Sequence, residues 1–183
     1  MPFAKKTSQA AADAHARQAS VHVVSADRRA RRLSRLALRA FGCSVQSFAS
    51  SRDFVALGVA QQPDCVLVDS TLPGNAAPAV QWTAQHAPVR IPVVLIGDAG
   101  TSVAIAVQAM KSGAVDFLCA PVRTSDLEAA VRSAVAVAGV WRAEDMRRTR
   151  ANVLAARLTP RERAVFALVL KGRLNKQIAA DLD

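Results

Sequence analysis

The sequence predicts an α/β protein, in which a doubly wound sheet of five parallel strands is followed by a helical tail. Two observations predict the sheet. Between Val21 and Val137 short apolar runs alternate with amphipathic segments, and the run Cys65–Val68 is apolar at every position. Strands that alternate with helices form parallel sheets covered by helices on both faces. A central strand of such a sheet is apolar throughout, as Cys65–Val68 is.

The first half of this pattern predicts two strands and two helices. Leu33 and Leu36 recur at helical spacing in a segment with six arginines, which indicates an amphipathic helix. Gly42 suits the left-handed residue that ends a helix, and Ser50 or Ser51 can cap the next one. The expected elements are a strand at Val21–Val24, a helix at Asp27–Ala40, a strand at Val45–Phe48 and a helix through Ala60.

The second half predicts three more strands, and the first of these ends abruptly at Asp69. A helix containing Val80 and Trp82 is expected to run to about His86, and Thr101 or Ser102 is expected to cap a later one. The remaining elements are strands at Val93–Ile96 and Ala114–Leu118, a helix at Val103–Lys111, and a long helix from Asp126, preceded by Ser125.

The charge and the cysteine content limit the kind of protein that this sequence can encode. The net charge is +10, and residues 141–183 are the most basic segment for their length. This fits a polyanionic partner such as nucleic acid, although a solvated helix face would look the same. No apolar run reaches the length of about 18 residues that a membrane span needs. Cys65 and Cys119 lie in apolar runs and are expected to be buried, reduced thiols, which together predict a cytoplasmic protein with no membrane partner.

Several stretches carry a family resemblance: VHVVSAD, VLVDSTLPG, IPVVLIG and AVQAMKSGAVDFLCAP. They resemble the receiver domains of response regulators of the FixJ/NarL branch, over about 120 residues. The resemblance implies a flavodoxin-like receiver domain at 21–137. It is preceded by a disordered lead-in at 1–20 and followed by a linker helix at 138–157.

The resemblance also implies a phosphotransfer site at the carboxyl ends of the strands, with Asp69 at the phospho-acceptor position. In this family an acidic pair after the first strand helps to hold Mg²⁺, and a Ser or Thr and a Lys bind the phosphoryl oxygens. Here Ser25 and Ala26 replace the acidic pair. The other degenerate positions are Gly97 (or Ile96) for the hydroxyl, Ala120 for the lysine, and Phe117, which keeps the aromatic switch position.

These replacements predict a pseudo-receiver. Asp27 is one position from the missing carboxylate, and it is better suited to cap the following helix. One certain carboxylate is too few for a hard cation, so we expect weak or absent Mg²⁺ binding, no other metal or cofactor, and no efficient phosphorylation of Asp69. In the family, partners bind the face formed by helix four, strand five and helix five. That face predicts a homodimer, unless its apolar residues only pack on the sheet.

The tail begins with a strong helix signal. Thr159 suits the N-cap, Pro160 the first helical position, and Glu162 completes a capping box. The run LTPRERAVFALVLKGRLNKQIAADL at 158–183 resembles the first half of a LuxR-type helix-turn-helix, in which a later helix reads the bases. The resemblance implies a truncated motif whose recognition helix is absent, with DNA-backbone candidates at Arg161, Arg163, Lys171 and Lys176. The linker suits either a pairing helix or a solvated basic strut.

The favoured function is therefore a DNA-binding transcriptional regulator, an atypical two-component response regulator that works without phosphorylation. It would act through a homodimer or another signalling protein, and on DNA in its full-length form. One alternative is a truncated interaction protein that pairs with other regulators without binding DNA. Another is a conventional receiver phosphorylated on Asp69 by a histidine kinase. An enzyme is not expected, because His15, His22 and His86 show no pairing with a nucleophile.

Overall fold

The computed structural model describes residues 18–73, 78, 81, 83–84, 87 and 89–182. The chain divides into two compact units, Met1–Arg142 and Ala143–Asp183, and each is described by itself. The expected lead-in falls mostly outside the described residues. The same is true of most of the helix expected around Val80 and Trp82.

The first unit is built on a sheet of five parallel strands, as predicted. The strands are β1 (Ser20–Val24), β2 (Ser44–Phe48), β3 (Cys65–Asp69), β4 (Val93–Gly97) and β5 (Asp116–Cys119). Their order is β2-β1-β3-β4-β5, so the chain reverses direction across the sheet beside β1 and β3. This is the doubly wound topology that the sequence predicts, and it places Asp69 at the carboxyl end of the central strand.

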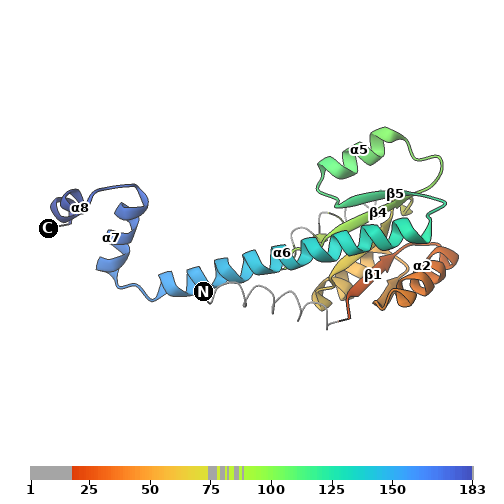
Figure 1. The fold of residues 1–183 in the computed structure, drawn as a ribbon, viewed down its shortest axis with the longest axis horizontal. Helices are drawn as coiled ribbons and strands as arrows, with labels where there is room; N and C mark the ends of the chain where they lie inside the picture. The colour runs from red at the N-terminus through yellow and green to blue at the C-terminus, as the bar shows by residue number, and fades with distance from the viewer. Residues whose placement is uncertain are drawn as a thin grey trace, which may run out of the picture. The chain divides into compact units, whose positions relative to one another are not determined.

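Alternating side chains of the strands build a core on each face of the sheet. On one face, Val21, Val23 and Leu67 pack with Leu38 of α2 (Arg28–Ala40) and with Leu127 and Val131 of α6 (Thr124–Ala156). Figure 1 shows α2 and α6 lying along this side of the sheet. On the other face the strands contribute Val24, Val66, Val68 and Leu95, and these pack with Phe54 and with Ala109 of α5 (Val103–Lys111).

Local signals predicted most helix ends. The Asp27 side chain accepts a hydrogen bond from the Arg29 backbone nitrogen and caps α2, and Gly42 has the expected positive φ of 77°. Ser102 caps α5 by position. The helix expected through Ala60 is instead mixed: one turn of α3 (Ser51–Asp53), a π-helical segment η1 (Phe54–Gly58) and a 3₁₀ turn η2 (Val59–Gln61).

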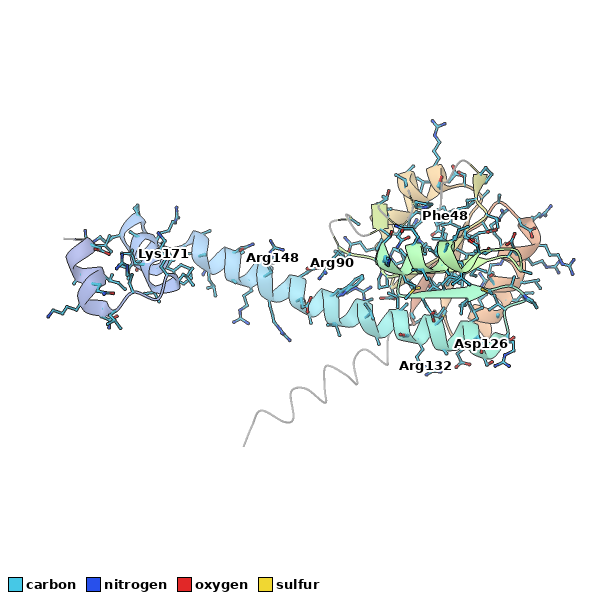
Figure 2. The ribbon with its side chains drawn as sticks, turned by 90° about the horizontal axis from the view of Figure 1, so that it is seen from above. Phe48, Arg90, Asp126, Arg132, Arg148 and Lys171 are labelled. Atoms are coloured by element: carbon cyan, nitrogen blue, oxygen red, sulfur yellow. The ribbon has the colours of Figure 1, made fainter. Side chains whose placement is uncertain are left out.

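Gly58 explains why that segment packs so closely. A Cβ atom at this position would lie 2.6 Å from the Phe54 ring and 2.9 Å from the Phe48 ring, and both rings are buried. Figure 2 labels Phe48 within the receiver. The glycine therefore lets two aromatic rings meet edge to face, with centroids 5.7 Å apart.

The C-terminal helices follow the predicted signals. α6 is 33 residues long and carries the chain without a break from the receiver into the predicted linker. α7 (Pro160–Leu170) begins with the full capping box of Thr159 and Glu162, and α8 comprises Asn175–Asp181. No described helix is long and apolar enough to cross a membrane.

Two expectations about strand five were wrong. The strand begins at Asp116 rather than Ala114, and Cys119 is exposed, whereas Cys65 is fully buried. β5 is an edge strand, bordered by a single neighbour, and Cys119 is its last residue. An apolar run at the end of an edge strand therefore does not guarantee burial on both faces.

Candidate functional site

The carboxyl ends of the central strands bring Asp69 and Ser25 together. β1 and β3 are paired neighbours; Asp69 ends β3, and Ser25 directly follows β1. Ser25 is buried, with 3% of its surface exposed. Its hydroxyl donates a 2.7 Å hydrogen bond to Oδ2 of Asp69. The residue that replaces a family carboxylate is thus a direct partner of the phospho-acceptor position.

The other oxygen of Asp69 is occupied by Thr71. The Thr71 backbone nitrogen donates to Oδ1 at 2.9 Å, and the Thr71 hydroxyl donates to the same atom at 2.6 Å. This is the local turn that an Asp side chain forms with a residue two positions later. Each carboxylate oxygen of Asp69 therefore already accepts a hydrogen bond from the protein.

Ser25 is itself fixed by its neighbours. Its Oγ accepts a 3.1 Å hydrogen bond from the Asp27 backbone nitrogen. Nη1 of Arg31 donates to the Ser25 carbonyl oxygen at 2.5 Å. The carboxylate of Asp27 is used as the cap of α2. The segment 25–31 thus forms a connected polar network that ends on Asp69, and networks of this kind rigidify a site when every member is satisfied.

Gly97, one of the two positions where the resemblance places the hydroxyl, faces both the Phe117 ring and the Thr101 hydroxyl. A Cβ atom on Gly97 would lie 2.7 Å from Cζ of Phe117 and 2.7 Å from Oγ1 of Thr101. Ile96, the other candidate for this position, packs against the α2–α6 face instead. Gly97 is therefore the residue that faces the aromatic ring, and its lack of a side chain is what gives the ring room.

The remaining degenerate positions contribute backbone rather than charge. The Ala120 nitrogen donates to the Gly97 carbonyl oxygen at 2.8 Å, and Ala26 is exposed. Asp98, in the loop after β4, accepts hydrogen bonds from the Gly100 nitrogen and the Thr101 hydroxyl. Within the described residues, no three His, Cys, Asp or Glu side chains gather into a group that could hold a metal ion.

Thr71 and Arg31 were not identified from the sequence. A Thr two positions after an Asp is a recognised turn signal, so the Thr71 contact was accessible in principle. The Arg31 contact was not, because six arginines lie on the same helix and only the fold selects the one that faces the Ser25 carbonyl.

The four basic candidates of the tail are all exposed. Arg161 and Arg163 lie in the first turn of α7, and Nη2 of Arg163 also donates to the Leu158 carbonyl at 3.3 Å. Lys171, labelled in Figure 2, is the C-cap of α7, and Lys176 lies on α8. The second unit therefore presents these cations to solvent along two short helices.

Two family models match this chain. Residues 21–132 match the response regulator receiver domain, and residues 156–183 match the bacterial regulatory proteins of the luxR family. The chain belongs to the response regulators. The match to transcriptional regulatory protein FixJ of Azorhizobium caulinodans, 30% identical, spans 88% of this chain and 76% of that protein.

Curated response regulators and solved structures agree with this assignment. Nodulation protein W of Bradyrhizobium diazoefficiens is 35% identical over 167 residues, covering 90% of this chain and 72% of that protein. Response regulator protein TodT of Pseudomonas putida is 33% identical, and the match spans 80% of this chain but 64% of TodT. The structure of the response regulator StyR matches with a TM-score of 0.69 at 28% identity, over 91% of this chain and 83% of that one.

Proposed function

We propose that this response regulator is a DNA-binding transcriptional regulator whose receiver works independently of phosphorylation. The carrying observation is the state of Asp69. Ser25 and Thr71 already donate hydrogen bonds to both of its oxygens, so the carboxylate is satisfied without a cation or a phosphoryl group.

Mg²⁺ and phosphate would find few ligands at this site. Mg²⁺ requires near-octahedral oxygen coordination, with carboxylates supplementing water. Asp27, the carboxylate next to the replaced acidic pair, caps α2. Position 120 is an alanine rather than a lysine, and Gly97, at the expected position of the switch hydroxyl, has no side chain. We therefore infer weak or absent Mg²⁺ binding and no efficient phosphoryl transfer to Asp69.

The signal would then pass through protein contacts. α5 carries four exposed apolar side chains, Val103, Ile105, Val107 and Met110, and β5 ends in the exposed Cys119. We propose this α5–β5–α6 face as the homodimer surface. Val103, Val107 and Met110 recur at spacings of four and three residues and so lie on one side of the helix, and apolar residues exposed together mark interaction sites. Sedimentation of the wild type and of V103E/V107E tests this, because a dimer built on this face would dissociate in the variant.

The phosphorylation question has a direct test. The chain is treated with Mg²⁺ and either acetyl phosphate or beryllofluoride, and the adduct is followed by intact mass and by chemical shifts near Asp69. We expect no stoichiometric adduct on the wild type. The triple variant S25D/A26D/A120K, which supplies the family's missing charges, should form one, and D69N in the same background should abolish it. A stoichiometric adduct on the wild type would make the chain a conventional receiver.

The second candidate is an interaction protein that pairs with other regulators without binding DNA. The four exposed cations of α7 and α8 favour DNA binding over this alternative, since they suit phosphate contacts. Gel shift with the promoter of the chain's own gene distinguishes the two. Binding that weakens in R161Q/R163Q supports the regulator, whereas dimerisation without any DNA binding supports the interaction protein.

A further inference from the structure

The receiver carries a second concentration of positive charge, on α2. This helix of 13 residues contains six arginines and no acidic residue: Arg28, Arg29, Arg31, Arg32, Arg35 and Arg39. The acidic residue beside it, Asp27, is used as the helix cap. The network around Asp69 uses one of these arginines, Arg31, through its hydrogen bond to the Ser25 carbonyl oxygen.

Most of these arginines line one groove. Arg28, Arg31, Arg32 and Arg35 recur at spacings of three and four residues, which places them along one side of the helix. Together with Arg29, Asp27 and Ser47, they line an open cavity of about 880 Å³. Ser47 belongs to β2, the edge strand of the sheet. The groove is thus a basic channel between a helix and an uncovered strand edge.

The charge in this groove is not neutralised within the described structure. Among the ion pairs between described residues, Arg123, Arg132, Arg142 and Arg173 each have an acidic partner, and none involves an arginine of α2. Arg31 donates only to the Ser25 carbonyl. Like charges three or four residues apart destabilise a helix, so an anion that binds here would relieve repulsion that the protein leaves in place.

The described residues that line the groove leave no carboxylate free to compete with an anion. Asp27 is the acidic residue among them, and its Oδ1 accepts a hydrogen bond from the Arg29 backbone nitrogen as the cap of α2. Ser47 lines the cavity, but its Oγ atom is buried from solvent. The groups that the groove offers to an anion are therefore the guanidinium groups.

The spacing of these guanidinium groups suits a row of phosphates. Arginine binds phosphate through a planar fork of donors, and all six cations of α2 are arginines rather than lysines. Arg28 and Arg35 are about 10 Å apart along the helix axis, which spans more than one phosphate of a DNA strand. No aromatic side chain lines the groove, so it offers no platform for stacking unpaired bases.

We propose that the arginine groove of α2 binds the phosphate backbone of duplex DNA, so that the receiver itself adds a sequence-independent contact. The proposal goes beyond the DNA contact assigned to the tail, and it rests on the proposed function only in that the tail brings the chain to DNA. Backbone contacts of this kind position a protein and raise its affinity without reading sequence. An acidic protein segment is the competing occupant.

The test measures the salt dependence of DNA binding by the full chain. A fluorescent mixed-sequence duplex of about 30 base pairs is titrated by anisotropy between about 50 and 200 mM salt. The variant R28Q/R32Q/R35Q removes three groove arginines and keeps Arg31, which holds Ser25. Each lost phosphate contact lowers the slope of log K against log salt by about 0.9. We expect the slope to fall by about 2 to 3, and affinity at low salt to fall at least about tenfold.

A matched control separates the groove from net charge. R52Q/R123Q/R132Q removes the same formal charge from exposed positions elsewhere on the receiver, and it should bind within about twofold of the wild type. Circular dichroism and thermal melting confirm that both triple variants fold. The proposal is overturned if the groove variant binds the duplex like the wild type, or if the control loses as much affinity as the groove variant.

Two further arms identify the occupant and keep the tail's role separate. Polyglutamate replaces the duplex as an acidic polypeptide probe; a groove variant that loses this polymer but keeps duplex binding would overturn DNA in favour of an acidic protein. The tail variant R161Q/R163Q is measured beside the others. If it binds normally while the groove variant does not, the tail's DNA role fails and the groove contact stands.

Discussion

A buried ion pair at the other end of the sheet gives the sharpest stability prediction. Asp64, just before β3, has 5% of its side chain exposed, and its Oδ1 lies 2.5 Å from Nη2 of Arg142 on α6. Its Oδ2 accepts a 2.7 Å hydrogen bond from the Ser20 nitrogen at the start of β1. Asp64 thus joins the start of β1 to α6. Its contact on α6, Arg142, lies one turn after Ala138, the last buried residue of that helix. Trp141 precedes Arg142 on α6, and Cζ of the Arg90 guanidinium lies over its ring, 4.9 Å from the ring centroid.

Replacing Arg142 by Ala leaves the Asp64 carboxylate buried with one remaining donor. Removing one partner of a fully buried pair costs about 3 to 5 kcal/mol. Arg142 retains 30% exposure and the Ser20 hydrogen bond persists, so we expect a loss of about 2 to 3 kcal/mol. At about 2 to 4 °C per kcal/mol for a chain of this size, the melting temperature should fall by about 5 to 10 °C.

Urea denaturation followed by circular dichroism measures this loss, with R132A as the matched control. Arg132 also pairs with an acidic residue on α6, Glu128, but its side chain is 77% exposed, and Figure 2 labels it on the outer side of the helix. An exposed pair of this kind contributes under about 1 kcal/mol. If R142A costs no more than R132A, or if D64N and R142A show no coupling in a double-mutant cycle, the pair does not stabilise the receiver as argued.

Three further predictions follow from buried groups. Burial lowers the pKa of His22 to about 4; since this is below its unfolded value, stability is intact above pH 6.5 and should fall by up to about 3 kcal/mol as the pH approaches 4. Urea titrations of the wild type and H22V measure this, and equal pH slopes would contradict it. G97A should destabilise the receiver by about 1 to 3 kcal/mol, because its Cβ would lie 2.7 Å from both the Phe117 ring and the Thr101 hydroxyl. Urea denaturation should show a smaller cost of G97A in an F117L/T101A background, and an equal cost would mean that these two side chains are not the obstacle. Cys119 should react with a thiol reagent in the native protein, whereas Cys65, whose thiol pKa is raised by burial, should react only after unfolding. Peptide mapping decides this, and early labelling of Cys65 would refute it.

Much of the fold was predictable because its signals are local. The capping box of Thr159 and Glu162 and the positive φ of Gly42 depend on residues within a few positions of each other. The parallel order of the sheet follows from the alternation of strands and helices. The π-helical segment at Phe54–Gly58 was missed because it depends on packing against Phe48, a residue on a different element, and the exposure of Cys119 depends on where the sheet ends.

The sequence could predict which family residues are replaced at the site, but it could not predict how the replacing side chains contact one another. Ser25, Ala26 and Ala120 could be recognised as departures from the family, because the resemblance aligns them. The sequence could not show that the Ser25 hydroxyl would turn toward Asp69, or that Phe117 would lie over Gly97. Both outcomes depend on side-chain rotamers, which tertiary packing selects.

Two local arrangements at this site have different physical roles, one in hydrogen bonding and one in packing. The hydroxyls of Ser25 and Thr71 donate hydrogen bonds to the carboxylate oxygens of Asp69, whereas the Phe117 ring fills the volume beside Gly97. We therefore expect a single substitution toward the family pattern to disturb either the hydrogen bonds of Asp69 or the packing beside Gly97, without making Asp69 phosphorylatable. S25D alone would place two carboxylates within about 3 Å of each other with no cation between them, which raises the pKa of one. On the proposal of a phosphorylation-independent receiver, we expect a phosphorylatable site to require the acidic pair and the lysine together.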